Sequence, residues 1–141
     1  MPAVFELEHA VQDDEIDSLG HVNNLAYLRW MIRAAVAHAT ERGWPTQRHL
    51  ELGCGWIVRS HTIKYLSPAF AGERVLIYTW VSNFKKITSL RKYKITRPAD
   101  ASVLAVAQTK WAFVDYQRNQ PRRVPREIMD SFEVVPEEQE P

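Results

Sequence analysis

Residues 13–44 constrain the fold more than any other part of the sequence, because a polar, turn-forming segment there leads into the only long helical pattern. Asn23 or Asn24 is suited to cap this helix, since a short amide side chain accepts hydrogen bonds from backbone N–H groups that lack partners in the first turn. Residues 25–42 are good helix formers, and Gly43 supplies the left-handed conformation that commonly ends a helix. The sequence therefore predicts a helix about 27 Å long.

The predicted helix is apolar on more than one side. Its apolar stripe consists of Leu28, Met31, Ile32, Ala35, Val36 and Ala39, and is widened by Tyr27, Trp30, Ala34 and Ala37. The helix is too short and too often interrupted by arginine to span a membrane. Other parts of the chain must therefore cover it.

Runs of β-branched and aromatic residues predict the strands that would cover the helix. They occupy residues 4–11, 56–66, 74–82, 89–97 and 102–115, and residues 98–101 are typical of a hairpin loop. The last four strands follow one another without an intervening helix, which favours antiparallel pairing and an α+β fold. We expect a loop over residues 44–55, a short helical turn over 126–132 and a flexible tail over 133–141. Residues 1–141 are predicted to form a single domain.

Composition and charge exclude several classes of protein. A net charge of +1 gives no electrostatic reason to expect nucleic acid as a partner. The single cysteine, Cys54, excludes an intrachain disulfide and a cysteine-based metal site. The N-terminus has no basic region followed by an apolar run, so we expect a cytoplasmic protein without a signal peptide.

A motif at the start of the predicted helix resembles the signature of a known family. The motif reads Asp17-Ser18-Leu19-Gly20-His21-Val22-Asn23-Asn24, with Tyr27 and Trp30 following, and it resembles that of hotdog-fold acyl thioesterases of the 4-hydroxybenzoyl-CoA thioesterase type. Residues 65–73 and 121–125 are similar to two further segments of that family. The resemblance thus covers nearly the whole chain, and it implies a curved antiparallel sheet wrapped around one long central helix.

The resemblance further implies subunits that pair edge to edge as a homodimer or homotetramer, and a reaction without a metal ion or cofactor. This sequence departs from related patterns at Glu15, where the family often has Asp, and at Leu19, where plant-type acyl carrier protein thioesterases usually have Asn. Another branch of hotdog thioesterases carries its catalytic carboxylate on the central helix. This helix has no carboxylate before Glu41, so Asp17 is the candidate.

Thioester hydrolysis needs a carboxylate and hydrogen-bond donors, and the motif offers both. Asp17 would act as the nucleophile or as the general base toward water. Backbone N–H groups near Asn24 and Leu25, at the positive end of the helix dipole, would hold the carbonyl oxygen as it becomes negative. Gly20 permits a tight turn between these elements, and His21 would orient Asp17 or donate to the thioester oxygen.

Further residues are candidates for substrate binding. They are Gly20, Asn23, Leu25, Tyr27 and His61 near the acyl group, and Lys85, Lys86 and Arg91 near the CoA phosphates. Structural roles stay open for several of them, because Tyr27 has the spacing of a core residue and a hairpin lysine pair is ordinarily just solvated.

The sequence thus predicts an acyl-CoA thioesterase that releases a free acid and CoA. An acyl carrier protein thioester as substrate, and a non-catalytic hotdog protein that binds an acyl ligand, remain as alternatives. No spacing predicts a charged group deep in the pocket, so we expect an aliphatic acyl group of medium to long chain rather than a hydroxylated aromatic one. The expected pocket floor consists of Leu28, Trp30, Met31 and Ile32, opposed by Trp80, Phe84 and Trp111.

Overall fold

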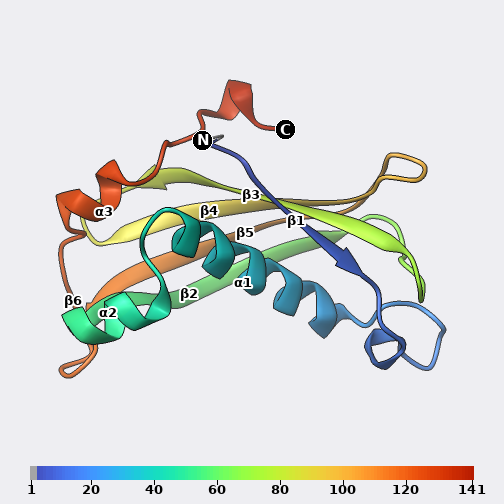
Figure 1. Ribbon diagram of the computed structural model, residues 1–141, viewed down its shortest axis with the longest axis horizontal. Coiled ribbons are helices and arrows are strands. Elements are labelled where there is room, and N and C mark those ends of the chain that lie inside the picture. Colours follow the sequence, from blue (N-terminus) through green and yellow to red (C-terminus); the bar gives the residue numbers. More distant parts are fainter. Residues whose placement is uncertain (1–2) are drawn as a thin grey trace.

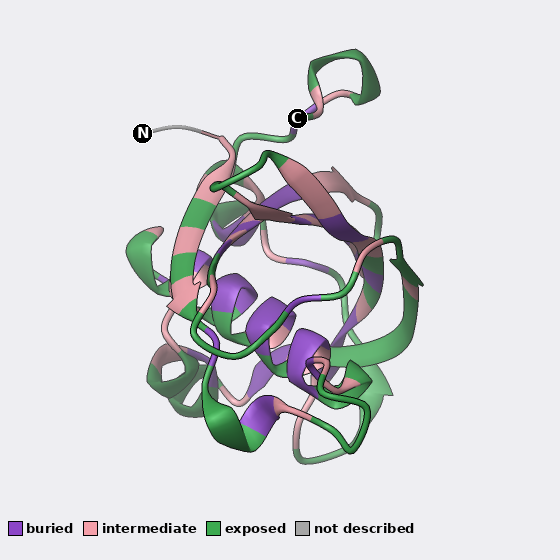
Figure 2. Cartoon of the chain, turned by 90° about the vertical axis from the view of Figure 1, so that its right-hand side faces the viewer, coloured by how far each residue is buried: buried purple, intermediate pink, exposed green. Residues whose placement is uncertain are grey.

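Helix α1, Asn24–Glu41, lies across one face of a curved antiparallel sheet in the computed structural model, which describes residues 3–141 (Figure 1). The strands are β1 (Phe5–Ala10), β2 (Cys54–Tyr65), β3 (Arg74–Phe84), β4 (Thr88–Arg97) and β5 (Ser102–Asp115). They pair in the order β1-β3-β4-β5-β2, and the short β6 (Gln120–Pro121) pairs with β5. The end-on view in Figure 2 shows the sheet curling around the buried side of α1. The expected α+β hotdog arrangement is confirmed.

Helix α1 begins and ends at the residues that the sequence indicated. Asn23 is the N-cap, and its Oδ1 accepts a hydrogen bond from the backbone N–H of Ala26 at 2.9 Å. At the other end Gly43 has φ +91°, a conformation that costs glycine little and other residues more. Local chemistry alone therefore explains where this helix starts and stops.

The main core lies between α1 and the sheet. On the helix Ala26, Trp30, Met31 and Ala34 are at most 1% exposed, and they pack against Val75, Ile77, Tyr93, Ile95 and Leu104 of the sheet. A second apolar cluster, near the C-terminal end of α1, joins Trp44, Cys54, Phe113, Val124 and Ile128. The lone cysteine is thus a buried core residue.

The segment expected as a loop over residues 44–55 contains a helix, so that expectation was wrong. Helix α2 spans Thr46–Leu52, with Pro45 as its N-cap residue and Gly53 closing it at φ +77°. The proline and the glycine that suggested a loop are the residues that bound a short helix. Its buried residue, His49, is stacked on Trp44 with ring centroids 5.2 Å apart.

The C-terminal residues also differ from expectation, because they pack on the sheet instead of forming a flexible tail. After the short helix α3 (Arg126–Asp130), Val135 is buried and its N–H donates to the carbonyl of Val81 at 2.9 Å. Glu140 pairs with Lys92 at 2.8 Å and accepts a hydrogen bond from Trp80 Nε1 at 3.3 Å. Trp80 therefore faces away from α1, and its predicted place opposite the apolar helix face was wrong.

We expect Met31→Ala to lower the free energy of unfolding by about 2–5 kcal/mol, because the fully buried side chain would leave a cavity under α1. The exposed Glu41 on the same helix offers the control, and Glu41→Ala should change stability by no more than about 0.5 kcal/mol. Urea unfolding of both variants measures this. Equal values for the two would contradict the central position of Met31.

Candidate active site

Asp17 is held at the tip of a tight loop by backbone hydrogen bonds. Its Oδ1 accepts from the N–H of Leu19 at 2.9 Å and of His21 at 3.3 Å, while its own N–H donates to the carbonyl of His21 at 2.8 Å. Gly20 makes the turn possible with φ +82°. Within residues 3–141 no donor is found for Oδ2, and the side chain is exposed. One carboxylate oxygen thus fixes the group, and the other is free to react.

The loop is attached directly to the first turn of α1. The backbone N–H of Asn23 and its Nδ2 both donate to the carbonyl of Glu15, at 2.8 and 3.1 Å, while its Oδ1 caps Ala26. The N–H groups of Asn24 and Leu25 have no acceptor in the described chain, and both residues are exposed. The carboxylate loop and two free donors of the helix N-terminus therefore belong to one hydrogen-bonded unit.

Glu15 is the buried support of this unit, a role that could not be predicted from the sequence. Its Oε1 accepts from His9 Nε2 at 2.7 Å and from the N–H of Gln12 at 2.9 Å, and its Oε2 accepts from Trp30 Nε1 at 2.7 Å. Arg33 Nη2 donates to His9 Nδ1, which leaves His9 Nε2 as the donor to Glu15. Burial raises the pKa of Glu15, but these hydrogen bonds outweigh it and the net pKa is lowered. Its position two residues before Asp17 was the only signal in the sequence.

The opposite side of the loop is formed by aromatic residues. The ring of His21 meets Phe70 edge to face, with centroids 5.4 Å apart and planes at 84°. The hydroxyl of Tyr65 donates to the carbonyl of Asn24 at 3.2 Å. The His21 ring is half-exposed beside this loop, and within residues 3–141 it is the backbone N–H of His21, not its ring, that donates to Asp17.

Tyr27 packs in the core rather than at the surface of the site. It is 3% exposed and lies against Trp30 and Tyr65, with ring centroids 4.9 and 5.2 Å away. Of the two roles considered for Tyr27, this geometry supports packing.

Three other candidates do not gather around Asp17 within the same chain. His61 lies on β2, where its Nδ1 is 2.7 Å from Thr109 Oγ1. Lys85 and Lys86 are exposed in the turn after β3, and β3 is about 30 Å long and starts beside the Asp17 loop. These lysines lie at the far end of the sheet.

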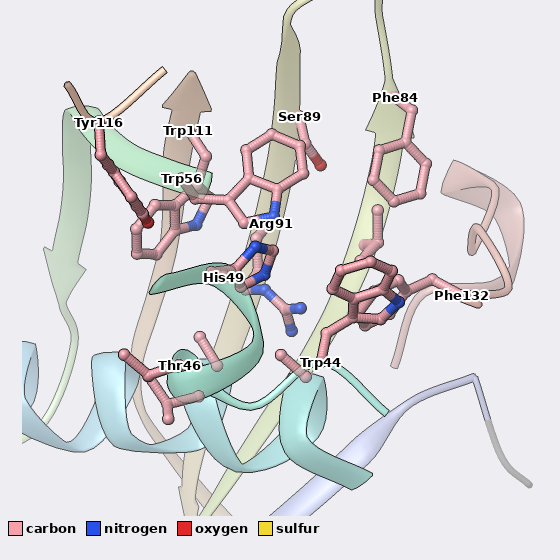
Figure 3. A pocket seen from close by; sticks show the side chains of 14 residues that line it. Trp44, Thr46, His49, Trp56, Phe84, Ser89, Arg91, Trp111, Tyr116 and Phe132 are labelled. Carbon is pink, nitrogen blue, oxygen red and sulfur yellow. The ribbon is translucent and has the colours of Figure 1, made fainter. Parts of the chain in front are cut away.

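A cavity of about 200 Å³ lies at that far end, beneath the C-terminal half of α1 (Figure 3). Its apolar walls include Trp44, Trp56, Phe84, Trp111 and Phe132. Arg91, expected near CoA phosphates, is only 6% exposed and projects into this cavity (Figure 3). The sequence predicted Arg91 near the CoA phosphates and no charged group deep in the pocket, whereas this cavity contains the buried Arg91 guanidinium. Arg91 lies on the same face of β4 as the buried Tyr93 and Ile95.

Two further findings concern residues 3–141 as a whole. No helix there is long and apolar enough to cross a membrane. No group of three or more His, Cys, Asp or Glu side chains in that range is placed to hold a metal ion.

Comparison with known families and structures is consistent with this geometry. The family model described as Thioesterase-like superfamily matches residues 11–132. It identifies the superfamily and not the narrower 4-hydroxybenzoyl-CoA thioesterase type, so only the wider resemblance is confirmed.

Solved structures share the fold over most of the chain. A 1,4-dihydroxy-2-naphthoyl-CoA thioesterase from Synechocystis has a TM-score of 0.84 at 19% identity, covering 91% of this chain and 94% of that one. A putative oleoyl thioesterase from Lactobacillus plantarum has a TM-score of 0.87 at 20% identity, and the match covers 94% of this chain and 52% of that one. A hypothetical protein from Staphylococcus aureus, solved in complex with CoA, has a TM-score of 0.85 at 12% identity, and the match covers 91% of this chain and 80% of that one. At these identities the likeness establishes the fold.

We expect Glu15→Gln to lower the free energy of unfolding by about 1.5–3 kcal/mol near neutral pH. Three groups donate hydrogen bonds to the Glu15 carboxylate, and the NH2 group of Gln would face one of them, donor against donor. Since the folded pKa of Glu15 is lowered, the contribution of its carboxylate is present above the ordinary value of 4.5 and is lost as the pH falls through the folded pKa. The stability difference between wild type and variant, measured by urea unfolding, should therefore shrink in acid. The exposed Glu6 provides the control Glu6→Gln, which should show no such trend. A pH-independent difference for Glu15→Gln would contradict this account.

Proposed function

The chain belongs to the thioesterase-like superfamily, and on this premise we propose that it hydrolyses an acyl-CoA thioester to a free acid and CoA. The observation that carries the proposal is the junction at the start of α1. There the exposed carboxylate of Asp17 and the unpaired N–H groups of Asn24 and Leu25 are held in one unit through Asn23. A thioester needs this pairing of a carboxylate with donors for a developing oxyanion.

Two routes use the same geometry. As a general base, Asp17 takes a proton from water while the water oxygen adds to the carbonyl carbon; the intermediate then expels the CoA thiolate, which is protonated. As a nucleophile, Asp17 displaces the thiolate to form a mixed anhydride that water then hydrolyses. In both, the carbonyl oxygen takes negative charge next to the positive end of the α1 dipole.

CoA is favoured over a carrier protein by the names of the solved relatives. One is a 1,4-dihydroxy-2-naphthoyl-CoA thioesterase, and another was solved in complex with CoA. Both thioester classes present the same phosphopantetheine arm, so the residues described would serve either, and a substrate panel separates them.

We expect Asp17→Asn to lower kcat by about 10²–10⁴-fold with little change in substrate binding, because the amide keeps the oxygen that accepts from Leu19 but loses basicity and nucleophilicity. A free-thiol assay over straight-chain, aromatic and carrier-protein thioesters measures this. Asp14, exposed in the same acidic run, gives the control Asp14→Asn, which should keep near-normal kcat.

Two outcomes would count against the proposal. If Asp17→Asn keeps more than about half of the wild-type kcat, the assigned role of Asp17 is wrong. If the wild type releases no thiol from any member of the panel, the non-catalytic binding protein becomes the better reading.

The second part of the proposal is a homodimer formed through β2 and α1. Strand β2 is an edge strand, and its outer part is exposed on both faces, including Ile57, Val58 and Tyr65. Beside it α1 carries an apolar stripe of Leu25, Leu28, Ile32 and Val36, of which Leu25 and Val36 are 63% and 43% exposed. A long bare edge next to an apolar stripe is unusual for a monomer. Pairing β2 with β2 of a second copy covers both features.

A two-fold axis through such a pair fixes how the two sites meet. The axis stands perpendicular to the strands and to α1, so the two copies of α1 run in opposite directions. Ile32, in the middle of α1, then lies near the axis. The cavity contacts α1 around Ala35 and Ala39, roughly 20 Å from the N-terminus of the same helix. In the dimer the N-terminus of one α1 lies beside the cavity of the partner, so the two chains together complete each site.

We expect Ile32→Lys to dissociate the dimer, because the axis would bring two unpaired charges together in an apolar contact. Light scattering at micromolar concentration should show a dimer for wild type and a monomer for the variant, and thiol release should fall with dissociation. Ala99→Lys, in the exposed turn before β5, should remain dimeric. A fully active wild-type monomer would overturn this arrangement.

A further inference from the structure

Arg91 carries a buried charge that has no carboxylate partner. It lies on β4 with its guanidinium among the side chains that line the cavity (Figure 3). Within residues 3–141 it forms no salt bridge. Its Nη1 donates to His38 Nδ1 at 2.9 Å and to Thr79 Oγ1 at 3.0 Å. A buried guanidinium is normally paired with an anion, so this arrangement is unusual.

Neither partner neutralises the guanidinium. Burial, with Arg91 and Arg42 nearby, lowers the pKa of His38 to about 3, so its ring is neutral. Because His38 Nδ1 accepts from Arg91, the ring proton is on Nε2. Burial lowers the pKa of Arg91 itself to about 10, with Tyr93 opposing the shift, and the group stays charged at neutral pH. The cavity therefore holds a net positive charge.

The Arg91 guanidinium has donors that are not used within residues 3–141. In the described chain no acceptor is found for Arg91 Nε or Nη2, the edge of the guanidinium that a carboxylate meets with two parallel hydrogen bonds. Donors without acceptors, inside otherwise aromatic walls, fit a ligand that is apolar along its length and anionic at its end.

We propose that this cavity receives the acyl group of a thioester substrate whose far end carries a carboxylate, bound by Nε and Nη2 of Arg91. The proposal rests on the proposed thioesterase activity and on the dimer that places a partner's Asp17 loop beside the cavity. Trp44, Trp56 and Phe84, which line the cavity, contact the apolar part of the acyl group. A cavity of about 200 Å³ holds one ring or a short chain, since a void of about 150 Å³ holds benzene. This replaces the aliphatic acyl group expected from sequence.

Matched pairs of acyl-CoA and ω-carboxyacyl-CoA of equal carbon number test the specificity. We expect wild-type kcat/KM to be at least about tenfold higher for the carboxylated member. Arg91→Met, which keeps the length and removes the charge, should bring that ratio to one or below. Arg91→Lys keeps the positive charge but lacks the two parallel donors of a guanidinium, so it should give an intermediate ratio.

Lys92→Met is the matched control, because it makes the same chemical change at the next residue on the opposite face of the sheet, where Lys92 pairs with Glu140. It should keep the wild-type ratio. A wild-type preference for the neutral member, or for a hydroxylated aromatic acyl-CoA over both, would overturn the carboxylate assignment. That result needs no variant, so a failure of Arg91→Met to fold does not remove the test.

A binding measurement separates this inference from the proposed reaction. Three tryptophans, Trp44, Trp56 and Trp111, line the cavity, so intrinsic fluorescence reports its occupancy. The probes are S-alkyl thioethers of CoA with and without a terminal carboxylate, which cannot be hydrolysed. Tighter binding of the carboxylated probe to wild type, lost in Arg91→Met, supports the inference even if no thioester is hydrolysed. Equal or tighter binding of the neutral probe overturns it even if thioesters are hydrolysed.

Discussion

Burial of the apolar face of α1 is the constraint on which the rest of the structure depends. Trp30, Met31 and Ala34 lose almost all their exposed surface against β3, β4 and β5, and the sheet must curve to cover a helix of this width. Because the apolar surface of α1 extends around more than one side, a single sheet does not cover it all. What remains uncovered, from Leu25 to Val36, lies next to the bare edge of β2. The curved sheet and the proposed dimer thus have the same origin, an apolar helix surface that is wider than one sheet covers.

The same helix separates the two chemical parts of the protein. Its N-terminus, capped by Asn23, presents free N–H groups and the loop of Asp17, whereas its C-terminal half covers the cavity that contains Arg91. The two ends are roughly 20 Å apart, which is more than a short acyl group spans. In the proposed dimer, a two-fold axis across mid-helix would place the end of one helix beside the start of the other. The dimer that we propose would therefore bring the two parts of the site together as well as bury apolar surface.

Features determined by local chemistry could be predicted from the sequence, and features determined by long-range packing could not. The ends of α1 at Asn23 and Gly43 follow from capping and from a left-handed residue, and the strands follow from β-branched runs. The loop of Asp17 was found because its residues are contiguous. Helix α2 was missed because Pro45 and Gly53 bound a short helix as readily as a loop. The role of Glu15 was missed, and the C-terminal residues were expected to be a flexible tail, because their polar side chains have buried partners, such as Trp30 and Trp80, far away in the sequence.

Arg91 is the clearest case of information that only the fold contains. On β4 the period of two places Arg91 on the same face as Tyr93 and Ile95, opposite Lys92 and Lys94. The sequence does not show that, within residues 3–141, no carboxylate pairs with the Arg91 guanidinium. A charge desolvated without a counter-ion typically costs several kcal/mol, a large share of the stability of a domain of this size. The hydrogen bonds from Arg91 to His38 and Thr79 offset part of that cost, and an apolar residue of similar length would avoid the cost altogether. A cost of this kind is consistent with selection for binding rather than for stability, because a ligand carboxylate recovers in the complex what the free protein loses.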